Sequence, residues 1–349
     1  MKRVRRVSLE ELSIERSCMF SHLIEPIATV KHGEVVEIET WDCYANAVNQ
    51  DQTLKDLVEK GIMLCKNPIT GPIYIEDSEP GDVLVVEIID IKLPQIGITA
   101  IPSTGGGLKD LFKELAYTTK FLKIENGKVV YQTNDRNYLE IEAKPFIGTI
   151  GLAPSAGPVS SLVPGRHGGN MDVADVCIGN KIFLPVAVEG AFFGLGDVHA
   201  VQGDGEICGT AAEVSSTVTL KFGLIKNKRI EWPRIESPEE IMVVCSSNLL
   251  EEAIRFSMME LIRWLCEDYG FEQIDAYMLL SLTARVRLAQ IVNPLSTLVV
   301  KFPKRLLEKE NYWKKKISKA TFINNLWPLP RLLLYVKMTY SSREGFEVI

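Results

Sequence analysis

The amino-acid sequence predicts a mainly β fold with antiparallel strands, a smaller C-terminal α/β layer and an extra tail. Three observations predict it: many strand-sized apolar runs, proline and glycine turns between them, and helical periodicity that is concentrated late in the chain. With 349 residues, of which 46% are hydrophobic and 24% charged, the chain can bury a large core. We expect a mainly β domain over residues 1–240, an α/β subdomain over 241–303 and an extension over 304–349.

The first part of the chain reads as strands joined by tight turns. Residues Val35–Thr40 alternate apolar and acidic side chains, as a half-buried strand does. Residues 51–66 predict a short helix that Gly61 ends. Further on, Asn126-Gly127 separates two β-rich runs, which predicts a hairpin.

Helical periodicity is clearest after residue 248. Apolar side chains at helical spacing predict an amphipathic helix over Leu249–Tyr269, and a second helix is expected over Gln273–Ile291, ending before Asn293-Pro294. Strand-like runs flank the pair, so an α/β layer follows. The tail is basic, aromatic and apolar by turns. It reads as an arm packed on the body or on a neighbouring subunit, with a membrane-surface segment as the alternative.

Composition excludes several classes of protein. The net charge of −6 argues against nucleic acid as a partner. No apolar run reaches the roughly 18 residues that a spanning helix needs, so we expect no transmembrane segment. The basic start lacks an apolar secretory region, and the seven cysteines form no CxxC pair, which favours reduced thiols. We therefore expect a cytoplasmic protein.

One stretch, Gly165–Thr210, concentrates the residues that carry chemistry. It is rich in glycine and holds His167 and His199 together with five acids: Asp172, Asp175, Asp197, Asp204 and Glu206. Bent backbone that presents several oxygen and nitrogen atoms is what a hard or borderline metal needs. The stretch predicts a metal-assisted hydrolytic site.

The motifs in this stretch resemble the acetamidase/formamidase family, whose members hydrolyse small amides. They read HGGNMD at 167–172, GDVHA at 196–200, QGDGE at 202–206 and CGTA at 208–211, followed by Glu213. Flanking matches are 26–33, 39–42, 67–75, 79–82, 276–277, 290–292 and Pro294, so the resemblance covers roughly residues 5–303. The family implies a mostly β fold of sandwich type, with a β-sandwich-like core and a smaller α/β part late in the chain. It also implies a divalent metal (zinc or calcium) and assembly as a homo-oligomer, a dimer or larger.

The resemblance assigns metal binding to Asp172, Asp197 and His199, with Asp42 and His167 as further candidates. Asp197 and His199 are two residues apart, so on a strand both side chains point to one face. For His167, a role as a turn cap competes evenly with ligation. Asp42 follows a strand, where a turn-forming aspartate is the common alternative.

The acids beyond the metal ligands supply proton transfer in this hypothesis. Glu206 is the expected general base, and Glu213 is the second candidate. Backbone N–H groups of the Gly203–Gly205 turn are expected to help stabilise the oxyanion. Cys208 offers an alternative, as a nucleophile, although a small buried residue beside the site explains it as well.

These features predict a metal-dependent hydrolase of short aliphatic amides such as formamide or acetamide, giving ammonia and a carboxylate. One departure motivates the alternative of a catalytically degenerate protein that binds a metal or a small ligand. Arg285 stands where the family pattern S-x-A-G-D has its aspartate.

Overall fold

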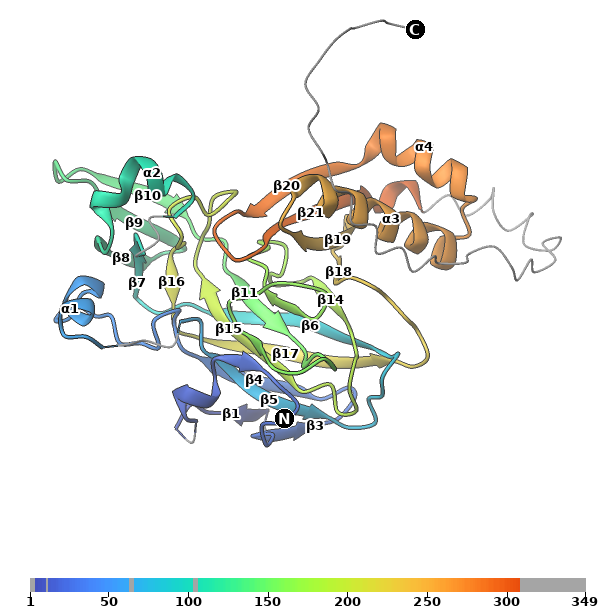
Figure 1. Ribbon diagram of the computed structural model, residues 1–349, viewed down its shortest axis with the longest axis horizontal. Helices are drawn as coiled ribbons and strands as arrows, with labels where there is room; N and C mark the ends of the chain where they lie inside the picture. The colour runs from blue at the N-terminus through green and yellow to red at the C-terminus, as the bar shows by residue number, and fades with distance from the viewer. Residues whose placement is uncertain (1–3, 11, 63–65, 103–105, 308–349) are drawn as a thin grey trace, which may run out of the picture. The chain divides into compact units, whose positions relative to one another are not determined.

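The computed structural model describes residues 4–10, 12–62, 66–102 and 106–307. These described residues belong to one unit. Its strands far outnumber its helices, which confirms the predicted mainly β class (Figure 1). All but the first four residues of the predicted extension, 304–349, lie outside the described part, and the division at residue 240 stays a prediction.

One of the two large sheets has nine strands. Its order is β1 (Arg5–Val7), β4 (Val35–Thr40), β17 (Ser216–Ile225), β6 (Val83–Lys92), β14 (Lys181–Pro185), β18 (Arg234–Glu236), β19 (Glu240–Ser247), β21 (Ser296–Pro303) and β20 (Arg285–Gln290). Neighbours in it are antiparallel except β1 and β4. The sheet therefore carries strands from both ends of the described chain.

The second sheet has ten strands. Eight follow the order β10 (Tyr138–Glu142), β9 (Lys128–Gln132), β8 (Thr119–Glu125), β7 (Ile96–Ala100), β16 (Glu213–Val214), β15 (Phe193–His199), β11 (Phe146–Gly151) and β13 (Gly168–Asn170). Beside them, β5 (Ile69–Ile75) pairs with β15 and with β3 (Ala28–Val30). A separate pair joins β2 (Met19–Phe20) to β12 (Val159–Ser160).

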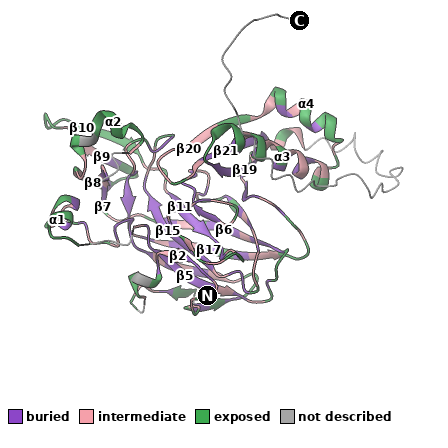
Figure 2. Ribbon diagram, in the orientation of Figure 1, coloured by how far each residue is buried: buried purple, intermediate pink, exposed green. Residues whose placement is uncertain are grey.

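The main core lies between the two large sheets. Alternation along β17 turns Val218, Leu220 and Phe222 inward, and all three are almost fully buried. They belong to one apolar cluster with Ile150 of β11 and Leu195 of β15, so side chains of both sheets share it. Figure 2 shows these strands largely in the colour of buried residues. This is the predicted sandwich-like packing.

The α-helices are α1 (Leu54–Glu59), α2 (Lys109–Phe112), α3 (Leu250–Tyr269) and α4 (Gln273–Thr283), with 3₁₀ turns at Ile14–Arg16, Gly106–Leu108, Lys113–Leu115 and Lys304–Leu306. A capping box of Thr53 and Asp56 starts α1. Gly270, at φ 69°, ends α3 in the left-handed conformation that glycine adopts easily. Helices α3 and α4 pack on β19 and β21 through a second apolar cluster (Figure 1).

The prediction of a second helix over Gln273–Ile291 is wrong for the residues after Thr283. Helix α4 ends at Thr283, and Arg285–Gln290 forms the strand β20. The segment RVRLAQ pairs with β21 from Arg285, opposite Lys301, to Gln290, opposite Thr297. Pairing with a buried neighbour satisfies the backbone of a segment whose weak periodicity suits either structure, so tertiary context decides.

Other local predictions are tested directly. Asn126 and Gly127 join β8 to β9, both at positive φ, which confirms the hairpin. Free thiols are present at Cys43, Cys177, Cys208, Cys245 and Cys266, but Cys18 is disulfide-bonded, so the expectation of reduced thiols fails there. Among the described helices, none has the length and apolar character to cross a bilayer.

A buried ion pair ties α3 to the sheet. Arg234 of β18 donates through Nε and Nη2 to Glu260 Oε1, at 3.0 and 2.7 Å, and both side chains are almost fully buried. Arg263 donates to the other oxygen at 2.8 Å. The Arg234 guanidinium also lies over the Trp264 ring, 4.8 Å from its centroid.

Arg234→Met is expected to lower the free energy of unfolding by about 3–5 kcal/mol, because it leaves the Glu260 carboxylate buried with its main partner gone. The double variant Arg234→Met/Glu260→Met should recover a large part of the loss. Denaturant unfolding measures both. Arg229→Met, whose exposed guanidinium pairs at the surface, serves as control and should change stability by under about 0.5 kcal/mol. Equal effects of Arg234→Met and Arg229→Met would contradict this account.

Candidate active site

Five predicted site residues gather at one end of the ten-stranded sheet. Asp197 and His199 lie on β15, Glu213 lies on β16, Asp172 follows β13, and Glu206 lies in the loop between β15 and β16. All five are at most 7% exposed. Their ligand atoms form overlapping groups whose members lie within 4.8 Å of one another: Asp172, Asp197 and His199 in one group, and His199, Glu206 and Glu213 in another.

The backbone at three of these acids is unusual. Asp172, Asp197 and Glu206 have φ values of 51°, 54° and 49°, in the left-handed region that residues other than glycine rarely adopt. Such conformations persist only where the surrounding structure enforces them, and they cluster at functional sites. Gly148 is equally constrained, since an added Cβ would lie 2.6 Å from Asp172 Oδ1 and 3.0 Å from Asp197 Oδ2.

His199 is at the centre of the cluster. Its Nε2 lies 3.3 Å from Asp197 Oδ1 and 3.1 Å from Glu213 Oε2. Its Nδ1 lies 2.9 Å from Gln202 Oε1. Gln202 Nε2 donates to the carbonyls of Asp172 and Ala289, both at 3.1 Å, so the amide oxygen must face His199. Nδ1 therefore carries a hydrogen, and Nε2 is directed at the two carboxylates.

Three asparagines hold the two aspartates. Asn67 Nδ2 donates to Asp197 Oδ2, and Asn293 Nδ2 donates to Asp172 Oδ2, both at 2.7 Å. The partners of Asn170 orient its amide nitrogen toward Asp197 Oδ2 at 2.8 Å and Asp172 Oδ1 at 3.1 Å. These donors fix the directions of both carboxylates.

Burial and mutual repulsion dominate the titration of the acids. Burial, then the Asp197 charge, raises the pKa of Asp172 to about 7. Burial and the Asp172 charge raise the pKa of Glu206 well above its ordinary value, and burial raises the pKa of Glu213. Burial alone would lower the pKa of His199, but the Glu213 and Asp197 charges outweigh it and raise that pKa well above its ordinary value. The cluster therefore favours positive charge at its centre.

The arrangement fits a divalent cation. His199 Nε2 and Glu213 Oε2 are buried and have no hydrogen-bond partner of proper geometry. Buried polar atoms without partners are rare, and each calls for an ion, a water or a functional reason. A nitrogen and several carboxylate oxygens that converge on one point are the donor set of zinc and similar metals.

A cavity of about 370 Å³ opens onto the cluster. Acids, amides and a cation line one side, namely Asp197, Glu206, Glu213, Asn67, Asn170, Asn293 and Lys66. Small or apolar residues line the rest, among them Pro102, Leu162, Val292 and Pro294. A few convergent polar groups in a small pocket suit a short polar substrate.

Backbone hydrogen bonds to two different segments hold the loop that carries Glu206. Gly205 N donates to Ala289 O at 3.0 Å, and Ile291 N donates to Gly205 O at 3.2 Å, so the end of β20 holds it. On the other side, Gly107 N donates to Ile207 O at 2.8 Å. A Cβ on Gly106 would clash with the backbone of Cys208, so glycine permits this close approach.

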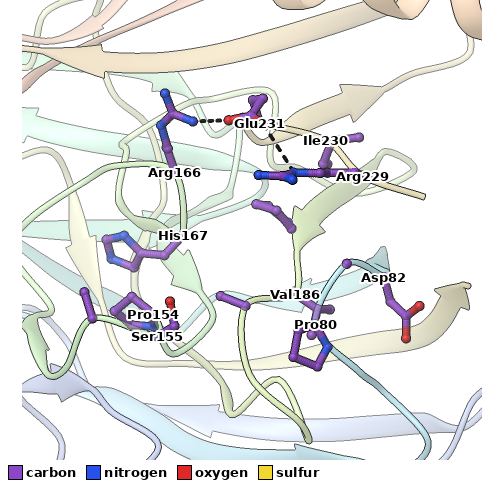
Figure 3. Close-up of a pocket in the computed structure, with 14 residues that line it drawn as sticks. Pro80, Asp82, Pro154, Ser155, Arg166, His167, Val186, Arg229, Ile230 and Glu231 are labelled. Atoms are coloured by element: carbon purple, nitrogen blue, oxygen red, sulfur yellow. Dashed lines mark hydrogen bonds and ion pairs between the residues drawn. The ribbon is translucent and has the colours of Figure 1, made fainter. Parts of the chain in front are cut away.

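Asp42 and His167 do not join the groups of ligand atoms. Asp42 Oδ1 accepts hydrogen bonds from the backbone of Tyr44 and Asn46, both at 2.8 Å, so it organises a turn. His167 lines another cavity, of about 560 Å³, beside Ser155 (Figure 3), and no acid of the cluster lines that cavity. Burial lowers its pKa to about 4. Their assignment as ligands stays a prediction that the geometry does not favour.

Arg285 and Cys208 also lie apart from the carboxylate cluster. The Arg285 side chain is 69% exposed on the edge strand β20, where it pairs with Glu240. Cys208 Sγ donates to Thr210 O at 3.3 Å. The substitution that motivates the degenerate alternative therefore removes no atom from the described site.

Sequence analysis missed the residues that orient the ligands. Asn67, Asn170 and Gln202 lie in motifs that match the family, and Asn293 lies between two such matches, but the motifs do not assign them a role. Their short polar side chains are typical of turns, so only the tertiary contacts separate an orienting amide from a turn residue. Two of these asparagines precede a proline, in Asn67-Pro68 and Asn293-Pro294, and this shared pattern is the sequence feature that could have marked them.

Known proteins resemble this chain over most of its length. Residues 19–161 and 157–309 match the model of the acetamidase/formamidase family. Crystal structures of acetamidases from Yersinia enterocolitica and Bacillus halodurans are 37% and 34% identical, with TM-scores of 0.77 and 0.76. The match to the Yersinia enterocolitica structure covers 87% of this chain and 93% of that chain. The match to the Bacillus halodurans structure covers 84% of this chain and 96% of that chain. An acetamidase of Mycolicibacterium smegmatis is 27% identical over 58% of this chain and 64% of its own length. The chain spans 61–69% of the length of the curated relatives it matches.

His167 predicts a pH-dependent stability. The folded protein holds it neutral with a pKa of about 4, whereas the unfolded chain binds a proton near the ordinary value of 6.5. The contribution of the neutral His167 imidazole to the free energy of unfolding is complete above pH 6.5 and is lost as the pH falls toward 4. Between about pH 7 and pH 5 the wild type should lose about 2 kcal/mol more of unfolding free energy than His167→Gln. Equal losses in urea titrations would refute this assignment.

Proposed function

Because the chain belongs to the acetamidase/formamidase family, we propose that it is a metal-dependent hydrolase of short aliphatic amides, giving ammonia and a carboxylate. The observation that carries the proposal is the buried cluster of acids around His199, which opens onto a small cavity. An amide needs an activated water, a stabilised oxyanion and an acid for the departing amine. The cluster offers groups for each of these tasks.

Asp172, Asp197, His199 and Glu213 are the residues that would hold the metal. Their burial and overlapping ligand groups support this set, and the partnerless atoms of His199 and Glu213 favour it over Asp42 and His167. A divalent metal there would polarise the amide carbonyl as a Lewis acid. The asparagines orient the aspartates, and Gln202 orients the imidazole, as outer partners of metal ligands do.

Glu206 is the residue that moves the proton. It lines the cavity, and burial and the Asp172 charge raise its pKa above the ordinary value, a shift that is common among carboxyl groups that transfer protons. In this role it takes the proton of the attacking water and returns it to the amide nitrogen as the C–N bond breaks. Glu213, the second candidate, accepts a hydrogen bond from Ala211 N at 2.7 Å and also contacts His199. Its position therefore suits a metal ligand.

The size of the cavity supports short acyl groups, since about 370 Å³ lies at the small end of ligand pockets. The proposal also includes a cytoplasmic location and a homo-oligomeric assembly. The alternative of a degenerate binding protein loses its motive, because Arg285 is exposed and paired with Glu240.

Ammonia release is the direct test. Purified protein is expected to release ammonia from formamide or acetamide, to lose that activity with a chelator and to regain it with the metal. Enzymatic ammonia detection and elemental analysis of the same samples measure this. Metal-loaded protein that is inert toward every short amide would contradict the activity, and full activity after complete metal removal would contradict the metal dependence.

Glu206→Gln tests the proton carrier. We expect kcat to fall by a factor of about 10² to 10⁴, with metal content unchanged, because an amide cannot accept the proton of the water. Asp204→Asn is the matched control, two residues away in the same loop, where the carboxylate pairs with Arg287 at 2.5 Å and is largely exposed. Steady-state kinetics of both variants measure the effect, and a Glu206→Gln enzyme as active as the control would exclude the role.

A further inference from the structure

We infer that Cys43 is a ligand of the metal ion, through its sulfur, together with Asp197 and Glu213. The inference rests on the proposed metal dependence and adds to it the chemical class of the metal. A thiolate ligand selects a thiophilic ion such as zinc and disfavours calcium, which binds oxygen.

The position of Cys43 carries the inference. The Cys43 sulfur and one carboxylate oxygen each of Asp197 and Glu213 lie within 4.8 Å of one another. Ligand atoms about 2.0–2.3 Å from one tetrahedral ion are roughly 3.3–3.8 Å apart, so small side-chain movements close the set. Cys43 is 5% exposed and lines the same cavity as both acids. The sulfur thus faces the metal site and the substrate cavity together.

A second observation points to a ligand at this place. Glu213 Oε2 and His199 Nε2 are buried, lack hydrogen-bond partners and belong to the same cluster as the Cys43 group. The two atoms lie 3.1 Å apart without a hydrogen bond of proper geometry, and such buried atoms call for an ion, a water or a functional reason. An ion bound by the sulfur, Asp197 and Glu213 would give the Glu213 oxygen a partner that no protein donor supplies.

The turn that presents Cys43 is built by other site residues. The Asp42 carboxylate accepts from the backbone of Tyr44 and Asn46, and Asp42 N donates to Asn46 Oδ1 at 3.0 Å. Cys43 O accepts from Asn67 N at 2.9 Å, and the Asn67 side chain binds Asp197. Asp42 is thereby a positioning residue for the sulfur ligand, which gives the sequence-predicted acid a role beside the metal.

Ligation exchanges a proton for the metal. The Cys43 S–H bond breaks, the sulfur keeps the electron pair and bonds the divalent ion, and the proton leaves through the cavity to solvent. No oxidant or reductant is needed. The metal-bound protein therefore holds a sulfur-to-metal bond that spectroscopy detects directly.

Cobalt(II) is the probe, because it replaces zinc and gives a sulfur-to-cobalt charge-transfer band in the near ultraviolet. The full-length protein is freed of metal, loaded with one equivalent of cobalt and examined by absorption spectroscopy. We expect the band in wild type and in Cys208→Ser, the control at the neighbouring free thiol, and its loss in Cys43→Ser. Metal affinity should fall at least 10-fold in Cys43→Ser.

Each outcome decides the matter. Bound cobalt without the band in wild type overturns the inference and leaves the proposed function intact. A band that persists in Cys43→Ser, or that disappears only in Cys208→Ser, also overturns it. Wild type that binds no cobalt yet releases ammonia contradicts both the inference and the metal dependence, but not the amidase activity. If Cys43→Ser does not fold, the presence or absence of the band in the wild-type spectrum decides the inference.

Discussion

The contact of one buried imidazole nitrogen with two buried carboxylates is the constraint on which the rest of the site depends. His199 Nε2 faces Asp197 and Glu213 with almost no access to solvent. Several buried acids in one place repel each other and lose hydration, so the fold must compensate for both. Amide donors, a fixed imidazole and the proposed cation provide that compensation.

The architecture explains how such a site is held. The ten-stranded sheet supplies β15 and β16, and the loop after β13 supplies Asp172. The nine-stranded sheet packs against it through the main apolar core. Its last strands reach the site from the C-terminal layer, where the end of β20 holds Gly205 and the following turn places Asn293 on Asp172. Distant parts of the chain therefore share one small volume, which explains why local strain at three acids is tolerated.

The sequence predicts the parts of this structure that are local. Alternation reveals most strands, and Asn126-Gly127 reveals its hairpin. The cluster of Asp172, Asp197, His199, Glu206 and Glu213 follows from motifs typical of a family. The sequence does not predict β20, because pairing with β21 overrides a weak helical pattern. Nor does it predict the asparagines or Cys43, because their roles depend on tertiary contacts, which span more than 100 residues between Asn67 and Asp197 and between Asn293 and Asp172.

We propose that one divalent ion lies among these residues and serves amide hydrolysis. Crystals of the metal-loaded protein, measured at the absorption edge of the bound metal, test it most directly. The account predicts one strong anomalous peak per chain within bonding distance of His199 Nε2 and Glu213. A peak elsewhere in the molecule, or none in crystals of protein that releases ammonia, would contradict it.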